Sequence, residues 1–221
     1  MKILVTGAAG YIGSTLVDML LDEYEVIAVD NFMYDNQYAL WPHLRDWNLM
    51  IHKGDVRDKS FIFPLYKQAD VIIPLAAIVG APACEEKYSD SLEINQNVII
   101  DMISQLSAKQ KVIYPNTNSG YGIQGEQECT EASPLKPISW YGITKCAGEK
   151  AVLEHADSCV LRLATVCGIS PRMRFDLMCN DFIAKLYYDK QIELFEPGFK
   201  RNFVDVKDVA RGFRWAINGN L

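Results

Sequence analysis

Apolar and polar positions alternate in blocks along the chain, and these blocks predict a parallel α/β fold. Short, continuously apolar runs are typical of buried strands, and between them apolar residues recur at the three- and four-residue spacing of a helix. The strand-like runs cover residues 3–5, 26–29, 49–51, 71–73, 111–114 and 159–163, and the helix-like stretches cover 12–21, 58–67, 90–108 and 139–155. Strands that are apolar on both faces and alternate with helices predict a Rossmann-type, doubly wound parallel sheet with helices on both faces.

The pattern changes near residue 165. Beyond it we predict a loop at 168–172, a helix over 175–188, short strands at 192–195 and 203–206, and a last helix over 207–217. The chain is therefore divided into a sheet domain, residues 1–165, and a small C-terminal lobe, residues 166–221. Ligands of parallel α/β sheets bind outside the carboxyl ends of the strands, and the lobe is expected to lie over that edge.

A glycine-rich turn follows the first predicted strand. Gly7, Gly10 and Gly13 stand in the order G-x-x-G-x-x-G between that strand and the first helix. Such glycines allow a tight turn, close approach of backbone N–H groups to a pyrophosphate at the helix N-terminus, and close packing of the helix. This context favours a dinucleotide site over a turn that binds nothing, which is the alternative interpretation.

Asp30 ends the second predicted strand, 23 residues after Gly7 (30 − 7). This is near the spacing expected for the acid that accepts both adenosine-ribose hydroxyls. A carboxylate at this place repels a 2′-phosphate, and residues 31–34 contain no arginine or lysine to bind one. The sequence therefore predicts NAD as the cofactor in preference to NADP.

Composition and charge exclude several other classes of protein. The 221 residues carry a net charge of −6 without a basic run, so nucleic acid is not an expected partner. The longest uncharged apolar run, 71–80, is too short to span a bilayer and contains Pro74, so no membrane association is expected. No continuous signal-peptide core is present at the start, and a cytoplasmic location is predicted. The six cysteines form no C-x-x-C pair and the three histidines are far apart, so no metal site is expected.

Tyr141 and Lys145 are four residues apart in the predicted helix 139–155 and therefore share a face. A nearby ammonium stabilises a phenolate, so we predict that Lys145 lowers the pKa of Tyr141 towards neutrality. The phenolate can then take a proton from a substrate hydroxyl while a hydride leaves the same carbon for NAD. A chance pairing on a surface helix is the alternative, and the glycine turn upstream argues against it.

With these motifs the sequence resembles the extended short-chain dehydrogenase/reductases of the NAD-dependent epimerase/dehydratase family. The matching segments are spread over nearly the whole chain, at 6–13, 29–31, 54–58, 75–77, 97–98, 121–122, 141–145 and 201–210. The resemblance implies a nucleotide-sugar substrate. Family members continue beyond the last of these segments with further strands and helices, so residues 166–221 are expected to form an incomplete sugar-binding lobe.

The resemblance also implies roles for individual residues. Asp55 and Val56 hold adenine, Lys145 also binds the nicotinamide ribose, Thr117 bonds the reacting oxygen, and Arg201 approaches the substrate diphosphate. The expected catalytic residues are Thr117, Tyr141 and Lys145. The expected cofactor-binding residues are Gly7, Gly10, Tyr11, Ile12, Gly13, Asp30, Asn31, Asp55, Val56, Leu75, Ala76, Ala77, Asn97, Tyr141 and Lys145. The expected substrate-binding residues are Val79, Asn118, Ser119, Arg174 and Arg201, and Ser119 is a rival to Thr117 for the reacting oxygen.

The segment after the fifth predicted strand narrows the reaction. Sugar 4,6-dehydratases resemble one another in carrying Thr-Asp-Glu there, whereas this chain has Thr117-Asn118-Ser119, whose last two side chains cannot act as carboxylic acids. The cysteine of 3,5-epimerases is also missing from this segment. Oxidation, reduction or epimerisation at C4 of the sugar remains.

Segments 72–82, 116–122 and 162–174 resemble the GDP-manno-heptose C4 dehydrogenases of bacterial capsule pathways more closely. That likeness favours a 4-dehydrogenase, with a GDP-linked sugar or heptose as one candidate substrate. A nucleotide-sugar 4-epimerase is the alternative, and a dinucleotide-binding module without turnover is the alternative from another class of protein.

Extended family members often pair through two helices from each subunit. Here the corresponding helices are 90–108 and 139–155, and a homodimer with a four-helix core is predicted. The apolar residues offered for this interface include Val98, Ile99, Met102, Ile103, Ala147, Ala151 and Val152. In the alternative interpretation, these side chains only cover the chain's own sheet.

Overall fold

The computed structural model describes residues 1–123, 128–195 and 197–219. Six parallel strands form one sheet in the order β3-β2-β1-β4-β5-β6. They are β1 (Lys2–Thr6), β2 (Glu25–Asp30), β3 (Leu49–Lys53), β4 (Val71–Pro74), β5 (Lys111–Thr117) and β6 (Ser158–Leu163). The strand order changes direction between β1 and β4, which is where sheets of this type bind their ligands. The predicted Rossmann-type fold is confirmed.

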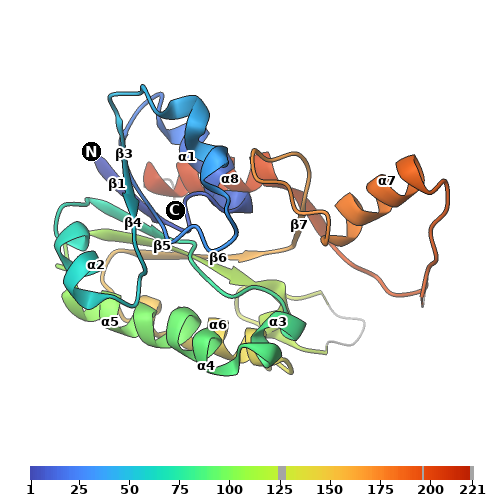
Figure 1. Ribbon diagram of the computed structural model, residues 1–221. Helices are drawn as coiled ribbons and strands as arrows, with labels where there is room; N and C mark the ends of the chain where they lie inside the picture. Colours follow the sequence, from blue (N-terminus) through green and yellow to red (C-terminus); the bar gives the residue numbers. More distant parts are fainter. Residues whose placement is uncertain (124–127, 196, 220–221) are drawn as a thin grey trace.

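Helices cover both faces of the sheet (Figure 1). The α-helices are α1 (Tyr11–Leu20), α2 (Lys59–Tyr66), α3 (Ala81–Glu86), α4 (Tyr88–Leu92), α5 (Val98–Gln105), α6 (Trp140–Leu153), α7 (Met178–Tyr188) and α8 (Val206–Ile217). Because neighbouring strand residues point to opposite faces, Ile3 and Val5 pack with α1 and α8, whereas Leu4 packs with α2, α5 and α6. None of the helices in the described ranges is long and apolar enough to cross a membrane.

Of the two helices predicted for the dimer interface, 139–155 is one continuous helix, α6, but 90–108 is not. Residues 90–108 form α4, a π-helical turn (Glu93–Asn97) and α5. Val98, Ile99, Met102 and Val152 are buried within the core of the chain itself. These four side chains therefore cover their own sheet and cannot supply the dimer face for which they were offered. A homodimer stays a prediction without support from these residues.

The predicted C-terminal lobe contains one element that belongs to the sheet domain. Helix α8 packs against α1, and Phe213, Ala216 and Ile217 are buried in the same core cluster as Ile3. The apolar residues of α8 recur every three or four positions, which gives it the stripe needed to cover a sheet. Of the residues beyond the predicted boundary at 165, only segment 168–203 therefore lies apart from the sheet domain. Helix α8 packs on the sheet domain and belongs to it.

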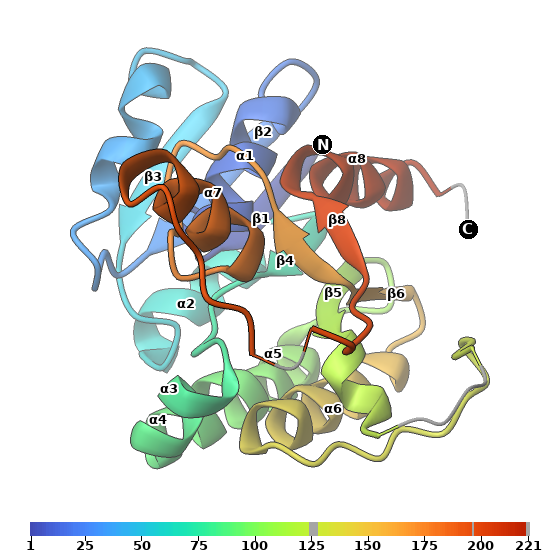
Figure 2. The same ribbon diagram turned by 90° about the vertical axis from the view of Figure 1, so that its right-hand side faces the viewer.

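Segment 168–203 lies over the carboxyl edge of the sheet, as Figure 2 shows from that side. A short parallel pair, β7 (Thr165–Cys167) with β8 (Phe203–Asp205), forms its base, and α7 projects from it. The strand predicted at 192–195 is wrong: these residues are irregular and mostly exposed. Within the described residues they have no neighbouring strand to complete a hydrogen-bond ladder, so their β-prone composition has no effect.

Replacing Phe213 should test how much the sheet domain depends on α8. Phe213 is fully buried, so Phe213→Ala should lower the free energy of unfolding by about 3–5 kcal/mol. Trp215 on the same helix is 49% exposed, and Trp215→Ala should change it by no more than about 0.5 kcal/mol. Urea unfolding of both variants measures the difference. Equal, small losses would show that α8 contributes little to the core.

Candidate active site

A cleft of about 610 Å³ opens where the carboxyl ends of the strands meet. It is lined by the glycine turn, the residues that follow β2, β4, β5 and β6, the first half of α6, and segment 172–177. Every residue predicted for the cofactor, the substrate or catalysis borders this cleft except Asn97. Residues far apart in the sequence therefore converge on a single site.

The glycine turn brings β1 against the end of β4. Gly7 has a φ of +67°, and a Cβ atom there would lie 2.7 Å from the backbone nitrogen of Ala76. A Cβ atom at Gly13 would lie 2.2 Å from the carbonyl oxygen of Gly7. Gly10 offers no side chain to cap α1, so the first N–H groups of this helix are left for an anionic ligand or water.

Asp30 is nine-tenths buried beside this turn. Its Oδ2 accepts a hydrogen bond from Ala9 N at 3.0 Å, and its Oδ1 accepts one from Phe32 N at 2.8 Å. Burial raises the pKa of the Asp30 carboxyl, and these two N–H groups act in the opposite direction. The carboxylate is thereby held in one orientation at the mouth of the turn.

Asn36 lies next to Asp30 in the cleft lining and was missed by the sequence analysis. Its Nδ2 donates to Ala9 O at 2.7 Å, and within the described residues its buried Oδ1 accepts no hydrogen bond. A buried acceptor without a donor is costly unless a ligand or water supplies one. The ribose hydroxyls of a dinucleotide are donors of this kind, so the residues present fit NAD. An amide in a loop six residues after a strand belongs to no motif that could have indicated it.

Asp55 borders the cleft after β3 and is engaged by two neighbours. Arg57 forms an ion pair with it at 2.8 Å, and Asn31 Nδ2 donates to its Oδ2 at 3.3 Å. The hydrogen bonds from Arg57 lower the pKa of the Asp55 carboxyl to about 2. Asp55 and Val56 both border the cleft, and the adenine contact predicted for them stays a prediction.

Asn95, not Asn97, connects the π-helical turn to the cleft. Asn97 Nδ2 donates to Glu93 Oε2 at 2.7 Å, and the residue lies outside the cleft lining. Asn95 is 1% exposed, and its amide both donates to Ile78 O and accepts from Ile78 N, each at 2.9 Å. It therefore fixes the backbone directly after Ala76 and Ala77. The two asparagines are only two positions apart in the sequence. Which of them bonds to the backbone beside the cleft depends on the rotation of the helix, which the structure shows and the sequence does not.

Thr117 and Tyr141 enter the cleft from different elements. Thr117 ends β5, and its Oγ1 accepts a hydrogen bond from Ser119 N at 3.2 Å. Tyr141 is in the first turn of α6, which Ser139 caps by accepting from Gly142 N at 3.1 Å. Burial raises the pKa of Tyr141 above its usual value, and the nearby Arg174 opposes this.

Lys145 is 4% exposed, and its ammonium lies 4.0 Å from the ring centroid of Tyr114. Burial lowers its pKa from 10.5 to about 7. The prediction that Lys145 lowers the pKa of Tyr141 is therefore contradicted for the protein without ligands. The loss of hydration disfavours the charged form of both groups, and a lysine that readily loses its proton exerts little field on the phenol.

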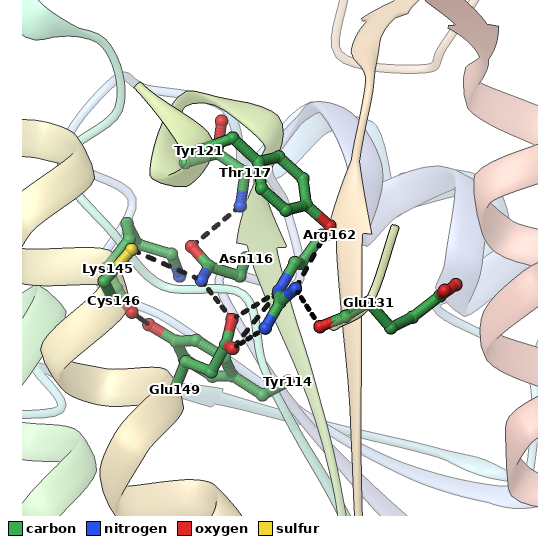
Figure 3. Close-up of polar contacts among 9 residues, drawn as sticks. All are labelled: Tyr114, Asn116, Thr117, Tyr121, Glu131, Lys145, Cys146, Glu149 and Arg162. Carbon is green, nitrogen blue, oxygen red and sulfur yellow. Dashed lines mark hydrogen bonds and ion pairs between the residues drawn. The ribbon is translucent and has the colours of Figure 1, made fainter. Parts of the chain in front are cut away.

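An ion pair and its hydrogen bonds link the elements that carry Thr117 and Lys145 (Figure 3). Glu149 on α6 is 2% exposed and pairs with Arg162 of β6 at 2.6 Å. Asn116 Nδ2 donates to the same carboxylate, and Asn116 Oδ1 accepts from Thr117 N at 2.8 Å. Arg162 also donates to Tyr121 Oη and to Glu131 O, both at 3.1 Å. The cluster links α6, β5 and β6, and it was not recognised from the sequence.

The substrate residues predicted in segment 168–203 also reach the cleft. Arg174 forms an ion pair with Asp176, and Asn118 Nδ2 donates to Asn202 Oδ1 at 2.7 Å. Val79, Ser119 and Arg201 border the cleft as well. Tyr11, predicted for the cofactor, uses its side chain differently: its Oη donates to Gly168 O at 2.7 Å and accepts from Asn180 Nδ2 at 3.2 Å. The first turn of α1 is thereby attached to the C-terminal segment.

Comparison with known sequences and structures identifies the family of this chain. Residues 3–220 match the NAD dependent epimerase/dehydratase family. An uncharacterized UDP-glucose epimerase, YtcB of Bacillus subtilis (strain 168), is 29% identical over 96% of this chain and 71% of its own length. The UDP-glucuronic acid 4-epimerase of Bacillus cereus, solved with UDP-glucuronic acid and NAD, is 28% identical with a TM-score of 0.88, covering 98% of this chain and 73% of that one. DesIV, a dTDP-glucose 4,6-dehydratase of Streptomyces venezuelae, is 26% identical with a TM-score of 0.88, over 98% and 72%.

The chain belongs to the NAD-dependent epimerase/dehydratase family. This membership confirms the predicted class of enzyme and the predicted cofactor, NAD. The more specific resemblance to GDP-manno-heptose C4 dehydrogenases, and the roles assigned to individual residues, stay predictions.

The pH dependence of stability should reveal the burial of Lys145. A base whose pKa is lower in the folded protein binds fewer protons there, so its burial opposes folding below about pH 7 and ceases to do so as the pH rises towards 10.5. Lys145→Met should therefore stabilise the protein most below pH 7, by on the order of 5 kcal/mol, and progressively less up to pH 10. Urea unfolding between pH 6 and 10, without cofactor, measures this.

Lys150 is exposed on the same helix and provides the control. The stability of Lys150→Met should follow that of the unaltered chain at every pH. If the stability difference for Lys145→Met did not change with pH, the lowered pKa of Lys145 would be refuted.

Proposed function

We propose that the chain is an NAD-dependent oxidoreductase that acts at C4 of a nucleotide-linked sugar. The observation that carries this proposal is the convergence of Thr117, Tyr141 and Lys145 on the same cleft as the glycine turn and Asp30. A dinucleotide-binding module without turnover has no need of a hydroxyl, a phenol and an amine at the far end of its cofactor site. The family and the nucleotide-sugar enzymes among its relatives support a nucleotide sugar as the substrate.

The chain's residues divide the work between holding the cofactor and moving one proton. The turn at Gly7–Gly13 would hold the diphosphate, and Asp30 with Asn36 Oδ1 would accept hydrogen bonds from the adenosine ribose. When bound, oxidised NAD supplies a hydride acceptor and a positive charge. Lys145 would contact the nicotinamide ribose, and its ammonium form would stabilise the Tyr141 phenolate.

Thr117 and Tyr141 would bracket the sugar C4 hydroxyl. Because Thr117 Oγ1 already accepts the Ser119 N–H, its own hydrogen is free to be donated to the sugar oxygen. Tyr141 would take the hydroxyl proton as the C4 hydrogen departs with its electron pair. The cluster of Glu149, Arg162 and Asn116 would keep β5 and α6 at the spacing that this proton transfer requires.

Two outcomes follow from the same first step. Return of the hydride to the opposite face of C4 gives a 4-epimerase, and the similarity to the UDP-glucuronic acid 4-epimerase supports this outcome. Release of the 4-keto sugar gives a 4-dehydrogenase, which the resemblance at 116–122 and 162–174 favours. Dehydration is not proposed, because Asn118 and Ser119 follow Thr117 where a dehydratase needs acids.

Removing the Tyr141 hydroxyl should stop the reaction while leaving the cofactor site intact. Positioned general-base catalysis is worth roughly 10²–10⁴-fold, so Tyr141→Phe should lower kcat at least 10²-fold with little change in NAD affinity. Turnover is followed by NMR of the sugar and by NADH absorbance in a single turnover. Lasting NADH with a 4-keto sugar indicates a dehydrogenase, and transient NADH with the C4 epimer indicates an epimerase. An unchanged kcat for Tyr141→Phe would rule out this mechanism.

Asp30 should control the choice of cofactor. We expect NADH to bind more tightly than NADPH, and Asp30→Ala to narrow the gap by about tenfold or more, because it removes the charge that repels a 2′-phosphate. Titration calorimetry with both cofactors measures the two affinities. Equal or tighter binding of NADPH by the unaltered chain would contradict the role given to Asp30.

A further inference from the structure

Arg172 reaches the adenosine end of the cleft from the C-terminal segment. Its guanidinium carbon lies 5.1 Å from the ring centroid of Tyr34, which is in the loop after β2. Both residues border the cleft together with Asp30 and Asn31. Residues 31–34 contain no cation, but the fold brings one to them from a segment that is distant in the sequence.

The position of Arg172 is fixed by a buried anchor two residues earlier. Ser170 is 4% exposed, and its Oγ donates to Tyr11 O at 2.7 Å. The same oxygen lies 3.1 Å from Ser14 Oγ and accepts a hydrogen bond from Arg172 N at 3.3 Å. The loop that carries Arg172 is therefore attached to the first turn of α1, where the diphosphate of a dinucleotide would lie.

The charge of Arg172 acts on the carboxyl groups of Asp30 and Asp176. Within the described ranges its guanidinium forms no ion pair, whereas the neighbouring Arg174 is paired with Asp176. Its field nevertheless reaches Asp30 and acts to lower the pKa of that carboxyl. Beside the Asp30 carboxylate there are thus a buried amide acceptor on Asn36 and a cation, Arg172, that has no ion pair in the described part of the chain.

We propose that Arg172 is a cofactor-selecting residue whose cation offsets, at the adenosine ribose, the repulsion that Asp30 exerts on a 2′-phosphate. The chain then prefers NAD(H) but binds NADP(H) measurably. This inference rests on the proposed dinucleotide site and concerns a residue that the glycine motif and its acid do not include. A planar guanidinium held by an aromatic face is well suited to a phosphate group.

The test is the ratio of two dissociation constants, Kd for NADPH over Kd for NADH, measured by fluorescence titration without sugar. Arg172→Gln should raise this ratio roughly tenfold or more, because a charge-assisted hydrogen bond to the 2′-phosphate is lost. Arg172→Lys, which keeps the charge, should stay closer to the unaltered chain. Arg211→Gln, at an exposed arginine of α8 outside the cleft lining, is the control and should leave the ratio unchanged. Because both cofactors are measured on the same preparation, partial unfolding does not alter the ratio.

Each other outcome has a definite meaning. If Arg172→Gln weakens both cofactors equally, Arg172 contacts only the shared diphosphate, and the inference is overturned. If neither affinity changes, Arg172 only packs on Tyr34, and it is overturned again. It also fails if the unaltered chain shows no binding of NADPH at millimolar concentration. In all three cases NADH binding leaves the proposed C4 chemistry standing, whereas a chain that binds neither cofactor contradicts both proposals.

Discussion

The close approach of Gly7 to the backbone of Ala76 is the constraint on which the site depends. Strands β1 and β4 are neighbours in the sheet, but the helices that follow them cover opposite faces, so the chain must leave the two strand ends in opposite directions. A Cβ atom at Gly7 would collide with the backbone there. Leu75 N bonds to Thr6 O at 3.0 Å, and Ala76 N bonds to Thr6 Oγ1 at 3.2 Å. The open N-terminus of α1 and the floor of the cleft both follow from this contact.

At the other end of the cleft, burial decides the protonation of Tyr141 and Lys145. It favours the uncharged phenol and the uncharged amine. The neutral pair and the phenolate–ammonium pair hold the same number of protons, so the choice between them follows the local field more than the bulk pH. A ligand that brings positive charge beside the phenol would therefore favour the phenolate when it binds.

The parts of the site that could be predicted from sequence are those whose chemistry is local. The glycine spacing, the acid at the end of β2, and the phenol one helical turn before Lys145 each lie within a single supersecondary unit. Asn36, Asn95 and Arg172 could not be found in this way, because their roles depend on the phase of a helix or on a contact between distant segments. The predicted direction of the pKa shift at Tyr141 was wrong for a related reason. Spacing shows which groups are neighbours, but only the fold shows how much hydration they lose.

The fold shows the same limit. Strands and helices with a strong period were predicted close to their observed bounds, including the helix that became α8. The spacing of apolar residues in α8 does not indicate which face of the sheet the helix covers. Its position against α1 depends on the course of the chain through segment 168–203. Residues 192–195 have the composition of a strand, but strand formation needs a partner, and the fold places none beside them among the described residues.

The packing of α8 on α1 also affects how the protein is made. Leu16, Val17 and Leu20 emerge from the ribosome early, whereas Phe213 and Ile217, which help to cover them, emerge almost two hundred residues later. One face of the sheet therefore stays partly uncovered through most of translation, even when all six strands are available. Such a nascent chain exposes apolar surface until α8 has emerged, and apolar surface exposed during folding is prone to aggregation.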